Sequence, residues 1–196
     1  MKVILRSLLF LLVAINSSAS AGVFNIPHFT APGSFAVGLE PEFTLNNGAN
    51  AAINVRYSHG LNELNNFHAI LGTGGVERAF RFGGAYSFDF FPDVPKQPGI
   101  GLALQALYIN RFDSGGMEIT TIPYIHKSLT AKGATFEPFM AFPVGISLAN
   151  GRYHYIGTLA FGSLFQHNEH FNSIVEVGIK MNNSDTYISG GLVYNR

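Results

Sequence analysis

The stretch from Gly33 to Gly48, GSFAVGLEPEFTLNNG, constrains the fold of this chain more than any other feature. Apolar residues occupy its odd positions from Phe35 to Leu45, whereas its even positions are small or polar and include Glu40 and Glu42. Alternation with a period of two is the pattern of a β-strand that has one apolar and one polar face. The stretch therefore predicts a strand, and the remaining question is which of its faces points outward.

The same alternation recurs along the rest of the chain, and turn-forming Gly, Asn and Asp residues separate the segments. No helical periodicity of any length interrupts this pattern. Most segments are about ten residues long, the length that a tilted strand needs to cross a bilayer. The pattern predicts ten strands, at residues 34–45, 51–58, 66–73, 79–90, 99–110, 117–128, 135–148, 153–165, 171–181 and 185–195.

The amino-terminal segment has the features of a secretory signal peptide. Lys2 and Arg6 form a short positive region, and an apolar run too short to span a bilayer as a helix follows them. The small residues Ala19 and Ala21 match the cleavage rule, with the cut before Gly22. We therefore predict that residues 1–21 are removed during export.

The remaining chain is predicted to form one domain. Residues 22–33 contain two prolines and no clean alternation, so they are interpreted either as a loose lead-in or as a plug inside the barrel. Residues 34–196 are predicted to form the barrel itself.

Composition narrows the class of protein further. Lys and Arg are balanced by Asp and Glu, twelve of each, so no basic surplus points to a nucleic-acid partner. Only 12% of the residues are charged, and the chain contains no cysteine. A soluble barrel would need many charged side chains on its outside, and a secreted domain of modest size commonly uses disulfides. A closed, hydrogen-bonded barrel in a membrane needs neither.

The two faces of the predicted strands differ in bulk as well as polarity. The apolar faces carry large aliphatic and aromatic residues that suit lipid, whereas the opposite faces are mostly Gly and Ala with scattered charges. We therefore predict an all-β fold, a single antiparallel up-and-down transmembrane β-barrel of about ten strands, with eight as the alternative count. The charged residues predicted to face the lumen are Glu40, Glu42, Arg56, Arg81, Asp89, Glu118, Glu137, Glu176 and Lys180.

Together with the signal peptide, this pattern resembles the small outer-membrane β-barrel proteins of Gram-negative bacteria. The resemblance includes the carboxyl-terminal stretch SGGLVYNR, in which Ser189, Gly191 and Tyr194 match the assembly signal of that family. Arg196 stands where the family usually has an aromatic residue, so the signal is partial. The resemblance implies an outer-membrane location, contact with outer-membrane lipid and insertion by the barrel-assembly machinery.

The interior charges favour a structural barrel or a narrow channel for small solutes. Six of them are acidic and three are basic, so a salt-bridged core and a narrow, cation-preferring path are both open interpretations. Neither requires a cofactor, a metal ion or enzymatic activity, and none is predicted.

Two alternative functions remain open. His126, Ser128 and Glu137 could serve acyl transfer, and the stretch PYIHKSL faintly resembles the histidine-serine strand of outer-membrane lipid A deacylases. Leu129 replaces the asparagine of that motif, and His126 is predicted to face inward. A soluble, lipocalin-like ligand-binding barrel is the other alternative, and it would place the apolar faces inside.

Overall fold

The computed structural model describes residues 30–45, 50–75, 80–111, 114–131 and 133–196. The predicted signal peptide (1–21) and most of the predicted lead-in or plug (22–33) lie outside these residues. Within the described residues, no helix is long and apolar enough to cross a membrane.

All of the regular elements in the described residues are β-strands, and their bounds follow the alternation of the sequence closely. They are β1 (Phe35–Thr44), β2 (Ala51–Asn62), β3 (Asn65–Gly74), β4 (Phe80–Phe91), β5 (Gly99–Arg111), β6 (Ser114–His126), β7 (Leu129–Ala131), β8 (Ala134–Ala141), β9 (Val144–Ala149), β10 (Arg152–Gln166), β11 (Phe171–Asn182) and β12 (Tyr187–Asn195).

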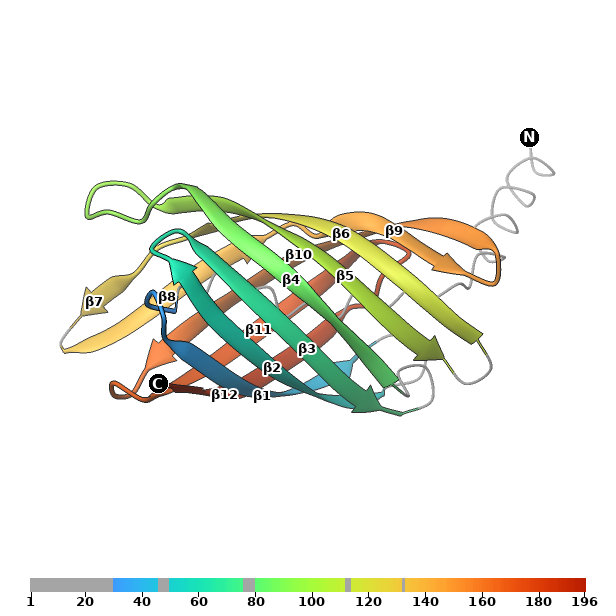
Figure 1. Cartoon of the computed structure of the whole chain (residues 1–196), viewed down its shortest axis with the longest axis horizontal. Coiled ribbons are helices and arrows are strands. Elements are labelled where there is room, and N and C mark those ends of the chain that lie inside the picture. The colour runs from blue at the N-terminus through green and yellow to red at the C-terminus, as the bar shows by residue number, and fades with distance from the viewer. Residues whose placement is uncertain (1–29, 46–49, 76–79, 112–113, 132) are drawn as a thin grey trace, which may run out of the picture.

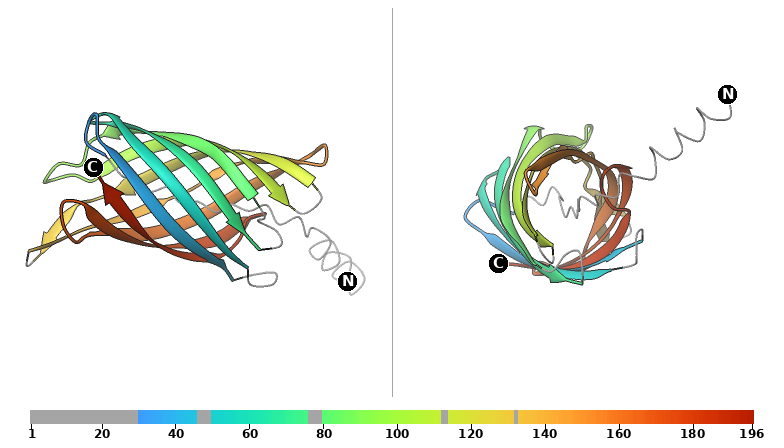
Figure 2. Two further views of the ribbon diagram at one scale, coloured as in Figure 1. Left: turned by 60° about the horizontal axis from the view of Figure 1, so that its bottom comes forward. Right: turned by 90° about the vertical axis from the view of Figure 1, so that its right-hand side faces the viewer.

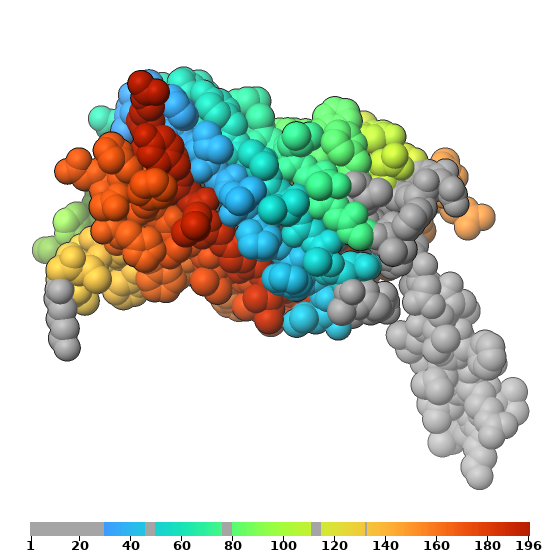
Figure 3. Space-filling model, turned by 90° about the horizontal axis from the view of Figure 1, so that it is seen from below, coloured from blue at the N-terminus to red at the C-terminus, as the bar shows by residue number. Residues whose placement is uncertain are grey.

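These strands form one closed, antiparallel barrel with ten strand positions around its wall. Strands β1 to β6 pair in sequence order, β10 to β12 complete the sheet, and β12 pairs with β1 to close it. Strands β8 and β9 follow one another along a single position between β6 and β10. Figure 2 shows the resulting cylinder from the side and along its axis, and Figure 3 shows β1 beside β12 at the closing seam. The predicted count of ten is confirmed.

Two predicted strands contain breaks. The predicted strand at 135–148 is interrupted at Phe142 and Pro143, because proline has no amide hydrogen for the ladder. The predicted strand at 117–128 ends early, at His126, and the chain resumes as the short strand β7, which pairs only with β8. Strand β7 therefore extends one rim of the barrel instead of forming another wall position (Figure 1).

The turn chemistry explains one of the tight connections directly. Asn150 and Gly151 join β9 to β10, with φ angles of 52° and 70°. Positive φ at both central residues is the requirement of a two-residue type I′ hairpin, which Asn-Gly meets at low steric cost. The predicted turn at this position is confirmed.

The side chains alternate between the two faces of the wall as the sequence predicts. In β1 the buried residues are the even positions, while Leu39 and Phe43 are 49% and 54% exposed. Large apolar side chains of other strands, such as Phe82 and Leu104, likewise point away from the interior. A soluble lipocalin-like barrel would have the reverse arrangement. The apolar outer wall is that of a barrel whose solvent is lipid.

The barrel has two distinct ends. The residues on either side of the closing seam, Phe35 and Arg196, exchange two backbone hydrogen bonds of 2.9 and 2.8 Å. We call this end the terminus-side mouth. The loop at residues 92–98 and the β7–β8 hairpin lie at the same end. The Asn150-Gly151 turn lies at the opposite end.

Candidate functional site

Most of the charged residues predicted to face the lumen lie inside the barrel. Each side chain in the main group is at most 7% exposed: Glu40, Glu42, Arg56, Arg81, Asp89, Glu118 and Glu176. Glu137 is partly exposed, with 19% of its side-chain surface accessible. Lys180 lies near one end of the barrel. It shares the inward register of Thr158, which is fully buried, but it lies near the end of β11, where its side chain is exposed.

Two buried ion pairs connect β1 to other strands inside the barrel, one to its neighbour β2 and one across the interior to β4. The Nη2 of Arg56 lies 3.2 Å from an oxygen of Glu40, and the Nη2 of Arg81 lies 2.9 Å from an oxygen of Glu42. Asn54 links the two pairs, because its Oδ1 accepts a hydrogen bond of 2.6 Å from Arg81 and its Nδ2 donates to the backbone of Glu40. We call these five residues the ionic layer.

On the strands that follow β1 across the closing seam, Glu176 of β11 accepts a hydrogen bond from the hydroxyl of Tyr187 of β12. Tyr187 is 0% exposed. Sequence reasoning did not single out Asn54 or Tyr187, since neither carries a charge. The sequence did contain a signal for these residues, since both occupy inward-facing positions of their strands. Asn54, for example, lies two residues before Arg56 on the same strand.

A second buried polar group was also missed. The ring of His68 in β3 bridges two serines, at 2.8 Å from Ser58 Oγ in β2 and 3.0 Å from Ser87 Oγ in β4. All three side chains are at most 3% exposed. The three side chains therefore supply hydrogen-bond partners to one another across three adjacent strands, as buried polar groups require.

His126 lies between two carboxylates at the terminus-side mouth. Its Nδ1 is 2.6 Å from Glu137 of β8, and its Nε2 is 3.0 Å from Asp89 of β4. With both carboxylates ionised, both ring nitrogens donate and the imidazole carries a positive charge. Gly99 leaves room for the ring, since a Cβ there would lie 2.1 Å from Nε2. We call His126, Asp89 and Glu137 the mouth triad.

The residues that follow β6 anchor the 92–98 loop. Lys127 donates to Asp93 and, at 2.7 Å, to the carbonyl of Val94, and the Ser128 amide donates to the second oxygen of Asp93 at 2.7 Å. Burial acts to raise the pKa of Asp93, but the hydrogen bonds from Lys127 and Ser128 outweigh it, so the pKa is lowered. This anchor explains why the strand ends at His126.

Ser128 therefore lies beyond the end of β6 and does not share a strand face with His126. Its side chain is exposed beyond the end of β6, whereas both ring nitrogens of His126 are engaged by carboxylates. Activation of a serine needs a ring nitrogen within hydrogen-bond reach of the hydroxyl. The geometry of His126, Ser128 and Glu137 is not that of an acyl-transfer triad.

The residues of the partial assembly signal all lie on β12. Ser189 is buried, and its hydroxyl donates a 2.7 Å hydrogen bond to the carbonyl of Pro41 across the closing seam. Gly191 lies on the same strand, and Tyr194 faces outward, with its ring 5.3 Å from that of Phe171.

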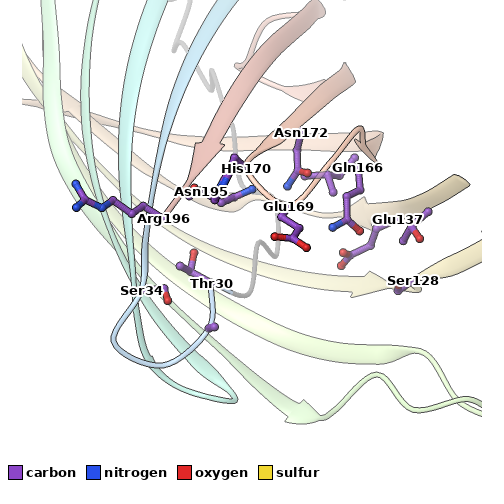
Figure 4. A pocket seen from close by; sticks show the side chains of 13 residues that line it. Thr30, Ser34, Ser128, Glu137, Gln166, Glu169, His170, Asn172, Asn195 and Arg196 are labelled. Atoms are coloured by element: carbon purple, nitrogen blue, oxygen red, sulfur yellow. Dashed lines mark hydrogen bonds between the residues drawn. The ribbon is translucent and has the colours of Figure 1, made fainter.

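A cavity of about 530 Å³ opens at the terminus-side mouth, and several polar side chains contribute to its lining. Figure 4 shows its polar lining, which comes from the β6–β8 region, the end of β10, the start of β11 and both sides of the closing seam. Glu137 belongs to this lining and thus connects the mouth triad to solvent. Within the described residues, no group of three or more His, Cys, Asp or Glu side chains is arranged to hold a metal ion.

Fold and site together define a class of protein, a ten-stranded membrane-spanning β-barrel whose interior carries buried ion pairs. No family model matches the chain, and no curated protein matches it. Among solved structures, it is similar to a chain described as "De novo design of transmembrane beta-barrels". The identity is 11% and the TM-score 0.45, over 86% of this chain and 100% of the other. The membrane assignment rests on the apolar outer wall of the chain itself.

Proposed function

We propose that this protein is a structural, non-conducting barrel of the outer membrane. The observation that carries the proposal is the burial of the ionic layer: Glu40, Glu42, Arg56 and Arg81 are between 0% and 3% exposed. An ion path needs charged walls that water can reach. Charges that are paired to each other and closed to water instead fill the interior and join strands of the wall to one another.

A narrow, cation-preferring channel is the second candidate. Its support is the excess of carboxylates, because Glu118 and Glu176 are buried at 3% and 1% exposure in addition to the two glutamates of the ionic layer. A surplus of negative charge in a low-dielectric passage would attract cations. This candidate predicts currents, whereas the structural barrel predicts none.

Conductance of the purified barrel in a planar bilayer separates the two candidates. We expect the wild-type barrel to be silent. The variant Glu40→Gln/Glu42→Gln should be less stable to urea, because Arg56 and Arg81 each lose one charged partner. Glu63→Gln, in the exposed turn before β3, is the matched control and should behave as wild type. Cation-selective currents that diminish in the double variant would instead establish the channel.

The outer membrane is the proposed location because of the predicted signal peptide and the partial assembly signal on β12. Under this proposal the partners are outer-membrane lipid and the barrel-assembly machinery. Fractionation of expressing cells, followed by electrophoresis with and without boiling, tests the location. A heat-shifted band in the outer-membrane fraction is expected, and recovery in the periplasm without such a shift would refute it.

We further propose that the barrel does not hydrolyse envelope lipids. The support is the geometry at His126, where Asp89 and Glu137 engage both ring nitrogens and Ser128 lies beyond the strand. Lipid A extracted from cells that express the wild type or His126→Ala should carry the same acyl chains. An acyl chain removed only by the wild type would overturn this proposal.

A further inference from the structure

The cavity at the terminus-side mouth has the size and lining of a ligand site. Its volume of about 530 Å³ falls within the range of small-molecule pockets, roughly 300–1,000 Å³. Its lining combines polar side chains with apolar surface, to which Leu164, 6% exposed, contributes. Such a combination suits a small molecule that carries a polar group on a short apolar body.

The charged groups at this cavity are predominantly acidic. Glu137 and Glu169 both line it, and Figure 4 shows their carboxylates turned toward the cavity. Among its described lining residues, Arg196 is the only Lys or Arg, and Figure 4 shows its guanidinium turned away. The electrostatic character of the cavity therefore favours a cation.

Glu137 is held in place by the mouth triad. His126 fixes one carboxylate oxygen at 2.6 Å and is itself held by Asp89 at 3.0 Å. The exposed 19% of the Glu137 side chain opens to the cavity. A carboxylate that is already oriented loses little conformational entropy when it binds a partner, which favours binding at this position.

The neighbouring amides supply further acceptors. Asn172 lines the cavity, and its buried Oδ1 has no hydrogen-bond partner within the described part of the chain. A buried acceptor without a partner costs free energy, which a donor on a ligand would recover. Gln166 contributes a second amide to the same lining. An ammonium group, with three donors and one positive charge, satisfies both the carboxylates and such an acceptor.

We propose that the cavity at the terminus-side mouth is a binding site for an ammonium group. Two sources share this chemistry: a free organic amine, or the α-ammonium of the exported chain itself. The described chain begins at this cavity, because Thr30 lines it and is 8% exposed. The carbonyls of Thr30 and Ala31 lie 2.3 Å from where a Cβ of Gly60 would be, which places this part of the chain on the inner face of β2. Only eight residues separate Thr30 from the predicted cleavage site before Gly22.

The test uses the mature chain, purified from membranes into a neutral detergent, and the variant Glu137→Gln/Glu169→Gln. Isothermal titration calorimetry with 1,5-diaminopentane measures amine binding, and the uncharged 1,5-pentanediol is the ligand control. Nuclear magnetic resonance of the labelled amino-terminal residue measures the pKa of its α-amino group. Glu63→Gln is the protein control, because Glu63 is an exposed acid at the same end of the barrel outside this lining.

Saturable diamine binding that weakens at least tenfold in the double variant, but not in Glu63→Gln, would support the site with a free amine as its ligand. A second outcome would support the site with the chain's own terminus as its occupant. In that case the diamine does not bind, and the α-amino pKa is raised above the ~8 of a free terminus in the wild type but not in the double variant. The proposal is overturned if neither signal is found, if the diol binds as well as the diamine, or if the double variant behaves as wild type.

Discussion

The ionic layer and the mouth triad use the same chemistry in different surroundings. In the ionic layer, Arg81 and Glu42 are 2% and 0% exposed and meet at 2.9 Å. In the mouth triad, His126 meets Glu137 at 2.6 Å, but 19% of the Glu137 side chain is accessible. Both pairs join a cationic donor to a carboxylate across strands, so burial is the variable that distinguishes them.

This difference assigns different roles to similar side chains. A charge that is closed to water depends on its partner, since loss of that partner leaves an uncompensated buried ion. A charge at the mouth retains access to water and can exchange partners at lower cost. The middle of the barrel is therefore suited to stability, and the mouth is suited to binding. Four experiments, taken from the largest expected effect to the smallest, test this contrast.

Arg81→Met is expected to be the most damaging change, because it removes a buried charge partner of Glu42 and a donor to Asn54. We expect the free energy of unfolding to fall by about 3–5 kcal/mol. Urea unfolding in lipid vesicles, followed by tyrosine fluorescence, measures it. Arg152→Met, at an exposed position at the start of β10, is the control and should change little. If the two variants are equally stable, the buried ion pair does not stabilise the barrel more than an exposed charge does, and the contrast between interior and mouth fails.

Glu42→Gln and Glu137→Gln form the matched pair that compares the two regions directly. We expect Glu42→Gln to cost about 1.5–3 kcal/mol, because the buried Arg81 guanidinium would then face a neutral amide in place of the charged carboxylate. Glu137→Gln should cost less than about 1 kcal/mol, since the amide oxygen still accepts from His126 and water reaches the site. Urea unfolding of both variants under the same conditions gives the comparison, and the reverse order would contradict it.

Tyr187→Phe tests a buried carboxylate whose donor is neutral. The variant removes the hydroxyl that donates to Glu176, at a position that is 0% exposed. We expect a loss of about 1–2 kcal/mol in the free energy of unfolding, which is less than for Arg81→Met because no charge is removed. Tyr194→Phe, on the outer face of the same strand, should be neutral. If Tyr187→Phe leaves the free energy of unfolding unchanged, the hydroxyl of Tyr187 does not stabilise the interior.

Lys127→Met should have the smallest global effect, below about 1 kcal/mol, because the ion pair with Asp93 is partly exposed. Amide hydrogen exchange should nevertheless become faster across residues 92–98 at neutral pH. Because the pKa of Asp93 is lowered in the folded state, its contribution is present above the ordinary pKa of aspartate and is lost as the pH falls through the lowered value. The variant and the wild type should therefore converge in acid. Lys96→Met, in the same loop, should leave the exchange unchanged.

The fold was predictable from the sequence because the strand pattern is local. Alternation around Phe35 or Phe82 depends only on neighbouring residues, and the Asn150-Gly151 turn carries its own φ requirement. The breaks were harder to predict. The end of β6 depends on Asp93, which contacts Lys127 and Ser128 from a loop more than thirty residues earlier in the chain.

The inward side of each strand was determined by the sequence alone, since a period of two assigns every side chain to one face and the apolar face must meet lipid. Partner choice was decided only by the tertiary structure. Arg81 binds Glu42 instead of Glu40, and His126 binds Asp89 and Glu137 instead of Ser128. The physical reason is that register and strand tilt set which inward side chains share a level of the barrel, and these depend on the closure of the whole sheet.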